Sequence, residues 1–142
     1  EGVRSENLEA LTYPDQTFDL VITQDVFEHI LNPDRGFREI ERVLKPGGLH
    51  VFTVPFNQEK KTVFRAVETP RGIRHLQEEI YHGNPIDPSG SLVTVDWGHD
   101  LVDFIYNASG LVTTVYCLAD RLILPREEPL EVFGSRKPAA GH

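Results

Sequence analysis

The sequence of 142 residues has a single cysteine and no methionine. One cysteine, Cys117, cannot form a disulfide within the chain, so nothing indicates a cross-linked secreted scaffold. Cys117 lies in an apolar, β-branched run, which predicts a buried core residue. No signal peptide opens the sequence, and we expect a cytoplasmic protein. Because methionine is absent even from the first position, we expect the sequence to be part of a longer chain.

The sequence also lacks long apolar runs and an excess of positive charge. Its longest apolar stretch, around Phe18–Ile22, is far shorter than the roughly 18 residues of a membrane-spanning helix. Asp and Glu number 22 against 14 Lys and Arg, which gives a net charge of −8. Because phosphate backbones and anionic membranes attract basic surfaces, we expect no nucleic-acid partner and no membrane span.

Three patterns of catalysis or binding are missing as well. The six histidines show no zinc-finger or His-x-x-x-His spacing, and we predict no metal site. No serine occupies a nucleophile elbow. The glycines of Lys45-Pro46-Gly47-Gly48 stand at a helix C-terminus, where the dipole disfavours a phosphate. The sequence therefore has no glycine-rich phosphate loop.

A strand–helix–strand pattern is present. It consists of a predicted strand at Phe18–Thr23, a helix between Asn32 and Lys45, and a strand at Leu49–Val54. The crossover of such a unit is right-handed, which makes its two strands parallel. Further along we expect a helix between Asp100 and Gly110, and strands at Leu111–Leu118 and Leu130–Ser135.

Ligands of open parallel sheets bind beyond the carboxyl ends of the strands, which here means Gln24–His29 and Pro55–Asn57. The first segment combines two carboxylates, an amide and an imidazole. Asp25 and His29 are candidate general bases there. The alternatives are that Asp25 and Glu28 cap a short helical turn, and that the role of His29 is structural.

Residues 7–54 resemble the middle of a class I S-adenosylmethionine-dependent methyltransferase. The matching pieces are Asn7–Leu11, Tyr13–Asp15, Phe18–Val21, Val26–His29, Arg38–Ile40 and Arg42–Gly48. Each piece is weak alone, but their order and spacing together are specific to this family.

The resemblance implies an α/β fold with a Rossmann-like, mostly parallel sheet of seven strands, of which this sequence supplies the later ones. S-adenosylmethionine is then the expected cofactor, and methyl transfer to an unidentified acceptor the expected reaction. The resemblance places Asn7 and Leu8 near the cofactor's adenine. It places Gln24 and Asp25 near its methionine part and the reacting methyl group.

The glycine-rich cofactor loop of the family is absent from these residues, as is its acidic ribose-binding residue. We therefore expect residues 1–136 to be the C-terminal portion of a longer enzyme, inactive as a fragment, and residues 137–142 to be a loose tail. One alternative is a catalytically inactive, methyltransferase-like binding module. Another is a nucleotide-sugar or nicotinamide enzyme built on a similar sheet.

Residues 55–98 form a connection far longer than the usual one of about 4–6 residues. Within it, Thr62–Glu68 and Ile73–Leu76 suggest a hairpin. We predict that the segment covers the cofactor cleft and selects a small-molecule, glycan or lipid acceptor. It adds His82 and His99 to the candidate general bases.

The predicted strand Phe18–Thr23 has no expected neighbour on one side. An open, apolar strand edge invites pairing with another chain. We therefore expect that this edge supports a homo-oligomer.

Overall fold

The computed structural model describes residues 4–84, 86–119 and 129–139. Its centre is a four-stranded sheet in the order β1-β2-β11-β10. The strands are β1 (Phe18–Gln24), β2 (Leu44–Thr53), β10 (Val112–Leu118) and β11 (Leu130–Arg136). β1 and β2 are parallel, whereas β11 runs antiparallel to both of its neighbours, β2 and β10.

The predicted parallel strand–helix–strand unit is confirmed. β1 and β2 pair from Leu20 opposite Leu49 to Gln24 opposite Thr53, and the helix α1 (Pro33–Val43) connects them. The described sheet as a whole is mixed, because β11 returns in the opposite direction between β2 and β10. β2 begins earlier than predicted, since Phe18 pairs with Leu44 before a register shift.

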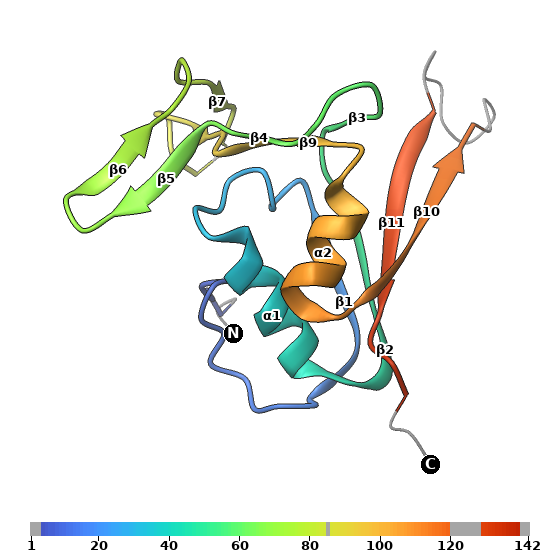
Figure 1. Ribbon diagram of the computed structural model, residues 1–142. Coiled ribbons are helices and arrows are strands. Elements are labelled where there is room, and N and C mark those ends of the chain that lie inside the picture. Colours follow the sequence, from blue (N-terminus) through green and yellow to red (C-terminus); the bar gives the residue numbers. More distant parts are fainter. Residues whose placement is uncertain (1–3, 85, 120–128, 140–142) are drawn as a thin grey trace.

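Both helices lie on the same face of this sheet (Figure 1). α1 starts at Pro33, which needs no N–H partner, and carries Asp34 in its first turn, where the dipole favours an acid. α2 (Leu101–Ser109) ends at Gly110, whose φ of 74° is the left-handed conformation that favours glycine. The predicted end of this helix at Gly110 is thereby confirmed, whereas Asp100, the expected cap at its start, makes no side-chain cap bond.

Aromatic side chains fill the space between the helices and the sheet. Phe27 stacks on Phe37 with ring centroids 4.0 Å apart, and Phe52 stacks on Phe133 at 5.1 Å. Trp97 is also buried in this cluster. Burial of such rings excludes water from a large apolar area, which is the main stabilising contribution of the core.

The opposite face of the sheet is apolar and open in the part of the chain that the structure describes. Leu20 and Ile22 of β1 are 49% and 67% exposed, and Tyr116 of β10 is 54% exposed.

Cys117 in β10 is exposed, so the prediction of a buried core cysteine is wrong. The apolar run of β10 gave the wrong answer because β10 is an edge strand that extends beyond the cover of the helices.

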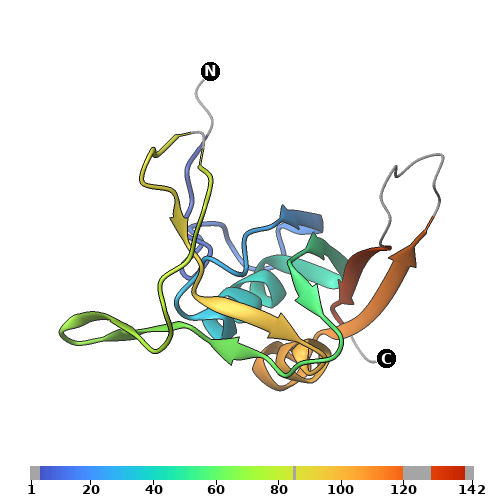
Figure 2. The ribbon, with the colours of Figure 1, turned by 90° about the horizontal axis from the view of Figure 1, so that it is seen from above.

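Short strands, not helices, make up the segment 55–98. They are β3 (Phe56–Asn57), β4 (Val63–Phe64), β5 (Ala66–Thr69), β6 (Gly72–His75), β7 (Tyr81–His82), β8 (Ser91–Leu92) and β9 (Val95–Gly98). β9 pairs with both β3 and β4, and the segment crosses the end of the sheet at which β1 and β2 terminate (Figure 1). The predicted hairpin is β5–β6, which projects from the rest of the molecule (Figure 2).

The chain near the C-terminus is anchored as far as Lys137. Its backbone N–H donates to the Gly48 carbonyl at 3.0 Å, and its ammonium donates to the Glu41 carbonyl at 2.8 Å. Lys137, expected to begin a loose tail, is thus held against the rest of the chain; residues 140–142 lie outside the described residues. No helix in the described part of the chain is long and apolar enough to cross a membrane.

Candidate functional site

The ends of β1 and β2 are joined through Asp25. The Asp25 N–H donates to the Thr53 carbonyl at 3.0 Å, and the Thr53 hydroxyl donates to Asp25 Oδ1, also at 3.0 Å. Asp25 has a φ of 50°, a left-handed conformation that aspartate tolerates better than most residues. Its side chain is exposed, and its Oδ1 is the acceptor of the Thr53 hydroxyl. The side chain of Gln24 is exposed beside it.

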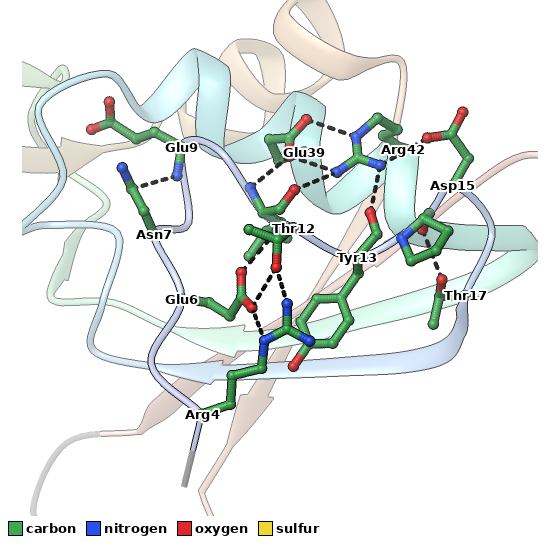
Figure 3. A network of polar contacts seen from close by, with 12 residues as sticks. Arg4, Glu6, Asn7, Glu9, Thr12, Tyr13, Asp15, Thr17, Glu39 and Arg42 are labelled. Atoms are coloured by element: carbon green, nitrogen blue, oxygen red, sulfur yellow. Dashed lines mark hydrogen bonds and ion pairs between the residues drawn. The ribbon is translucent and has the colours of Figure 1, made fainter.

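A polar network holds the N-terminal segment against α1 (Figure 3). The Arg42 guanidinium donates to the Glu39 carboxylate at 2.7 and 2.8 Å, and to the backbone carbonyls of Leu11 and Tyr13. Hydrogen bonds to the carboxylates of Glu39 and Asp15 hold the pKa of Arg42 above its usual value, because they favour the charged form. The network fixes the chain that leads to Asn7 and Leu8.

Asn7 and Leu8 have different surroundings. Asn7 is exposed and accepts a hydrogen bond from the Glu9 N–H at 3.0 Å, whereas Leu8 packs against the core. Asn32, the expected helix cap, makes no side-chain cap bond. Its amide instead donates to the Glu9 carboxylate at 2.8 Å, which ties the N-terminal segment to the loop after β1.

Three titratable side chains meet beyond the end of β1. His29 Nε2 lies 3.3 Å from His82 Nδ1, and Glu28 Oε1 lies 3.6 Å from His29 Nε2 and 3.9 Å from His82 Nδ1. We call Glu28, His29 and His82 the carboxylate–histidine cluster. The cluster joins the loop after β1 to β7, although His82 is 53 positions from His29 in the sequence.

The three side chains differ in exposure and in hydrogen bonding. The Glu28 side chain is 1% exposed, and neither carboxylate oxygen has a hydrogen-bond partner among the described residues. Burial raises the pKa of the Glu28 carboxyl, since the charged form is poorly solvated there. The side chains of His29 and His82 are 20% and 42% exposed, so the cluster is open on the His82 side.

Backbone contacts fix the cluster in place. Thr94 donates its N–H to the Glu28 carbonyl at 2.7 Å and its hydroxyl to the Ile30 carbonyl at 2.6 Å. His29 Nδ1 bonds to the Leu92 carbonyl at 2.8 Å. Since a carbonyl only accepts, His29 carries its proton on Nδ1, and its Nε2 lone pair faces the other two members of the cluster.

The cluster opens onto a cavity of about 550 Å³ between the strand ends and the segment 55–98. Glu28 and His82 form part of its wall, together with Lys60, Lys61 and Trp97. Arg65 also lines it, but its charge is paired with Asp96 at 2.7 Å. A cavity of this volume is within the range of small-molecule sites.

The structure brings together only some of the predicted site residues. His29 and His82 are in contact, and Asp25 directly follows the last residue of β1. His99 is exposed, and its backbone N–H donates to the Lys60 carbonyl; its side chain does not line the cavity. Glu28, interpreted from the sequence as a possible cap, is instead the buried member of the cluster.

The cluster also bears on the prediction that the sequence holds no metal site. That prediction rested on spacing along the chain, and spacing cannot register a contact between distant segments. Possible ligand atoms of Glu28, His29 and His82 all lie within 4.8 Å of one another. The sequence feature that could have indicated such a metal site is the Glu28-His29 pair, together with His82 in the long segment 55–98.

Comparison with known proteins agrees with the resemblance seen in the sequence. Residues 2–52 match the model of a methyltransferase domain family. The chain is 48% identical over 122 residues to the ubiquinone/menaquinone biosynthesis C-methyltransferase UbiE of Pasteurella multocida, an alignment that covers 75% of this chain and 45% of that protein. The corresponding protein of Hydrogenovibrio crunogenus is 57% identical over 42 residues, 30% of this chain and 16% of that protein.

The chain therefore resembles S-adenosylmethionine-dependent methyltransferases, in sequence over residues 2–52 and in fold over most of its length. It spans less than half the length of these two curated relatives.

Solved structures of other proteins share the fold. An S-adenosylmethionine-dependent methyltransferase from Mesorhizobium loti has a TM-score of 0.57 at 17% identity, over 92% of this chain and 67% of that one. The [4+2]-cyclase SpnF has a TM-score of 0.55 at 19% identity, over 94% of this chain and 54% of that one. Neighbours with such different reactions mean that the fold alone does not decide the chemistry.

The donor set at the end of β1 fits part of the cofactor that this family uses. Asp25 offers an exposed carboxylate that suits an ammonium group, and Gln24 offers an exposed amide. Asn7 and the apolar edge of Leu8 suit a purine base. Among the described residues, no glycine-rich loop follows a strand that leads into a helix, so contacts to the ribose are not part of this set.

Proposed function

We propose that this chain is part of an enzyme that transfers a methyl group from S-adenosylmethionine to a small-molecule, glycan or lipid acceptor. The observation that carries the proposal is the cavity between the family-matched strand ends and the segment 55–98. In open sheets of this type, ligands bind beyond the carboxyl ends of the strands. The cavity is therefore in the right position for an acceptor, because Glu28 and Pro55 in its wall follow the ends of β1 and β2.

The strand-end residues are proposed to hold the cofactor. When bound, S-adenosylmethionine supplies an electrophilic methyl group on a sulfonium. Asn7 and Leu8 would contact its adenine, and Gln24 and Asp25 its methionine part. The bonds between Asp25 and Thr53 support this role, because they fix the carboxylate relative to both strands. Precise orientation of the reacting groups provides much of the rate in a displacement of this kind.

Residues of the loop and the insertion are proposed to handle the acceptor. Asp25, His29 and His82 are the candidates for removing its proton. The contact between the last two at the cavity wall supports a shared role. Lys60 and Lys61 add positive charge to the same wall, which favours an acceptor with an anionic or strongly polar group. The segment 55–98 is then both the cover of the cleft and the source of acceptor specificity.

In the whole protein, we propose that β1 is not the last strand of the sheet. The sheet would continue beyond β1 to the seven-stranded, mostly parallel sheet of the family, in a cytoplasmic enzyme longer than this chain. The exposed Leu20 and Ile22 support an additional layer over this face. Pairing of a second copy along the β1 edge is the competing way to satisfy the same strand.

Calorimetry on the intact gene product tests the proposal. We expect binding of S-adenosylmethionine and S-adenosylhomocysteine, and weaker binding to the 142-residue segment when it is expressed alone. Methyl transfer is then followed with a labelled donor and a panel of small polar acceptors, glycans and lipids. Failure of the intact protein to bind either cofactor form contradicts the proposal. Tight cofactor binding without transfer to any acceptor favours a catalytically inactive binding module.

A further inference from the structure

We propose that the carboxylate–histidine cluster of Glu28, His29 and His82 binds one divalent transition-metal ion, such as zinc. The ion would lie at the cavity wall, beyond the end of β1. This inference goes beyond methyl transfer. A bound ion would use the lone pairs of His29 and His82, which would leave Asp25 as the candidate general base. The inference rests on the spacing of three donor atoms, the tautomer of one histidine and a buried carboxylate without a partner.

The spacing of the donor atoms already suits an ion. The three distances of 3.3, 3.6 and 3.9 Å form a nearly regular triangle of His29 Nε2, His82 Nδ1 and Glu28 Oε1. A point in its plane lies about 2.1 Å from all three atoms, and zinc–nitrogen and zinc–oxygen bonds are about 2.0–2.2 Å long. Little movement of the side chains is needed to complete three metal bonds.

The hydrogen bonding of His29 prepares it as a ligand. Its Nδ1–H donates to the Leu92 carbonyl at 2.8 Å, so the unprotonated Nε2 is directed into the cluster, where it lies 3.3 Å from His82 Nδ1. Histidines that bind metals usually donate their other ring N–H to a carbonyl or carboxylate in this way. The backbone of β8 therefore fixes both the tautomer and the orientation that a metal ligand requires.

Glu28 supplies an independent reason for a cation. Its side chain is 1% exposed, and both carboxylate oxygens lack a hydrogen-bond partner among the described residues. Buried carboxylates are usually paired, protonated or bound to a metal, because an isolated buried charge is very costly. No lysine or arginine pairs with Glu28 in the described part of the chain; its basic neighbours within 4.0 Å are the two imidazoles.

The ligand types indicate the class of ion. Two imidazoles and one carboxylate suit zinc, iron or cobalt better than magnesium or calcium, which prefer oxygen ligands alone. Three protein ligands leave at least one position open, as in catalytic rather than structural zinc sites. Because the His82 side chain is 42% exposed and lines the cavity, that position faces the acceptor side. A water molecule or an acceptor oxygen would occupy it.

The test measures zinc affinity of the intact gene product without any methyl donor or acceptor. We expect one zinc ion per chain, with affinity reduced by at least about 100-fold in His82→Ala and in Glu28→Gln. His75→Ala is the matched control, since His75 and Glu79 form an exposed pair at 3.5 Å that lacks a third ligand. This variant should keep the wild-type affinity.

A second readout separates ligation from misfolding. Zinc should raise the melting temperature of the wild type and of His75→Ala, because it binds the folded state, and should not raise that of His82→Ala. His82 is partly exposed, so its replacement leaves the fold intact. The inference is overturned if the wild type binds no zinc, or if both cluster variants bind it as tightly as the wild type. Neither result bears on whether the protein binds S-adenosylmethionine.

Discussion

At the residue scale, Asp25 and His50 show how a polar side chain is used differently at the edge and at the centre of the same sheet. Asp25 is exposed at a strand end, where its carboxylate is available to a ligand. His50 is fully buried in β2, where Nε2 bonds to the Thr23 hydroxyl at 2.9 Å and the ring stacks on Phe52. The exposed Asp25 can therefore contact a ligand, whereas the buried His50 contributes to core packing.

Replacement of Asp25 by asparagine should reduce catalysis without loss of stability. Asn tolerates the left-handed φ of 50° and still accepts the bond from Thr53, so the strand ends remain joined. We expect turnover in the intact enzyme to fall by about 10- to 100-fold and the melting temperature to stay nearly unchanged. Asp19→Asn, at the other end of β1, is the control. A lower melting temperature with unchanged turnover would indicate a structural role for Asp25.

His50 should make the protein less stable in mild acid. Burial lowers the pKa of His50 to about 3 from an ordinary value of 6.5, so below pH 6.5 the unfolded chain binds a proton that the folded chain does not. Stability from this group is therefore full above pH 6.5 and falls, by up to about 1.4 kcal/mol per pH unit, as the pH drops toward 3.

Urea unfolding of the wild type and of His50→Gln between pH 7 and pH 4 measures this effect. The variant should show a weaker dependence of unfolding free energy on pH, since glutamine does not titrate. His99→Gln, which changes an exposed histidine, serves as the control and should follow the wild type. Parallel curves for wild type and His50→Gln would contradict the assignment.

At the scale of elements, the cavity depends on close packing between β9 and the turn that precedes β4. Gly98 ends β9, and a Cβ atom there would lie 2.2 Å from the Lys60 carbonyl oxygen and 2.5 Å from the Thr62 nitrogen. These are backbone atoms, which cannot move aside as a flexible side chain does. The absence of a side chain at Gly98 therefore determines where Lys60 and Lys61 lie.

Gly98→Ala should displace the turn at residues 60–62 and damage the cavity. We expect a loss of about 1–3 kcal/mol in unfolding free energy, as for other overpacked sites, and weaker binding of the acceptor. Gly83→Ala is the matched control, because no atom lies within 4 Å of the added methyl group and Gly83 has no positive φ. Equal stability of the two variants, measured by thermal and urea unfolding, would show that the turn adapts without cost.

At the scale of the whole molecule, the sheet has one covered face and one open face in the described residues. α1 and α2 cover the first, while Leu20, Ile22 and Tyr116 are exposed on the second. A strongly apolar sheet face is normally buried against another layer or another chain. The intact protein is therefore expected to cover it, by further elements of its own or by a second copy.

A charge on the open face should test this expectation. Ile22→Glu should lower the unfolding free energy of the intact gene product by about 2 kcal/mol or more, because it forces a charge into an apolar contact. Ile73→Glu, on the exposed strand β6, should have a much smaller effect. If sedimentation shows that Ile22→Glu converts an oligomer into a monomer, a second copy covers the face. An unchanged stability and mass for Ile22→Glu would mean that the face is open to water.

Local patterns in the sequence determined the elements of the central unit. Pro33 and Gly110 set helix boundaries because proline has no N–H to satisfy and glycine accepts a positive φ, which are properties of single residues. The apolar run at Phe18–Thr23 and the spacing of the following helix predicted the parallel pairing of β1 and β2. The order of short motifs over residues 7–54 was enough to indicate the family.

Only the tertiary structure decided which distant groups meet. His29 and His82 are in contact because β7 and β8 return across the loop after β1, and no local propensity encodes that path. The burial of Glu28 and the exposure of Cys117 likewise depend on what packs above each residue, not on its neighbours in the sequence. Contacts between distant segments arise from the net balance of core packing over the whole chain, so a pattern of single residues cannot determine them.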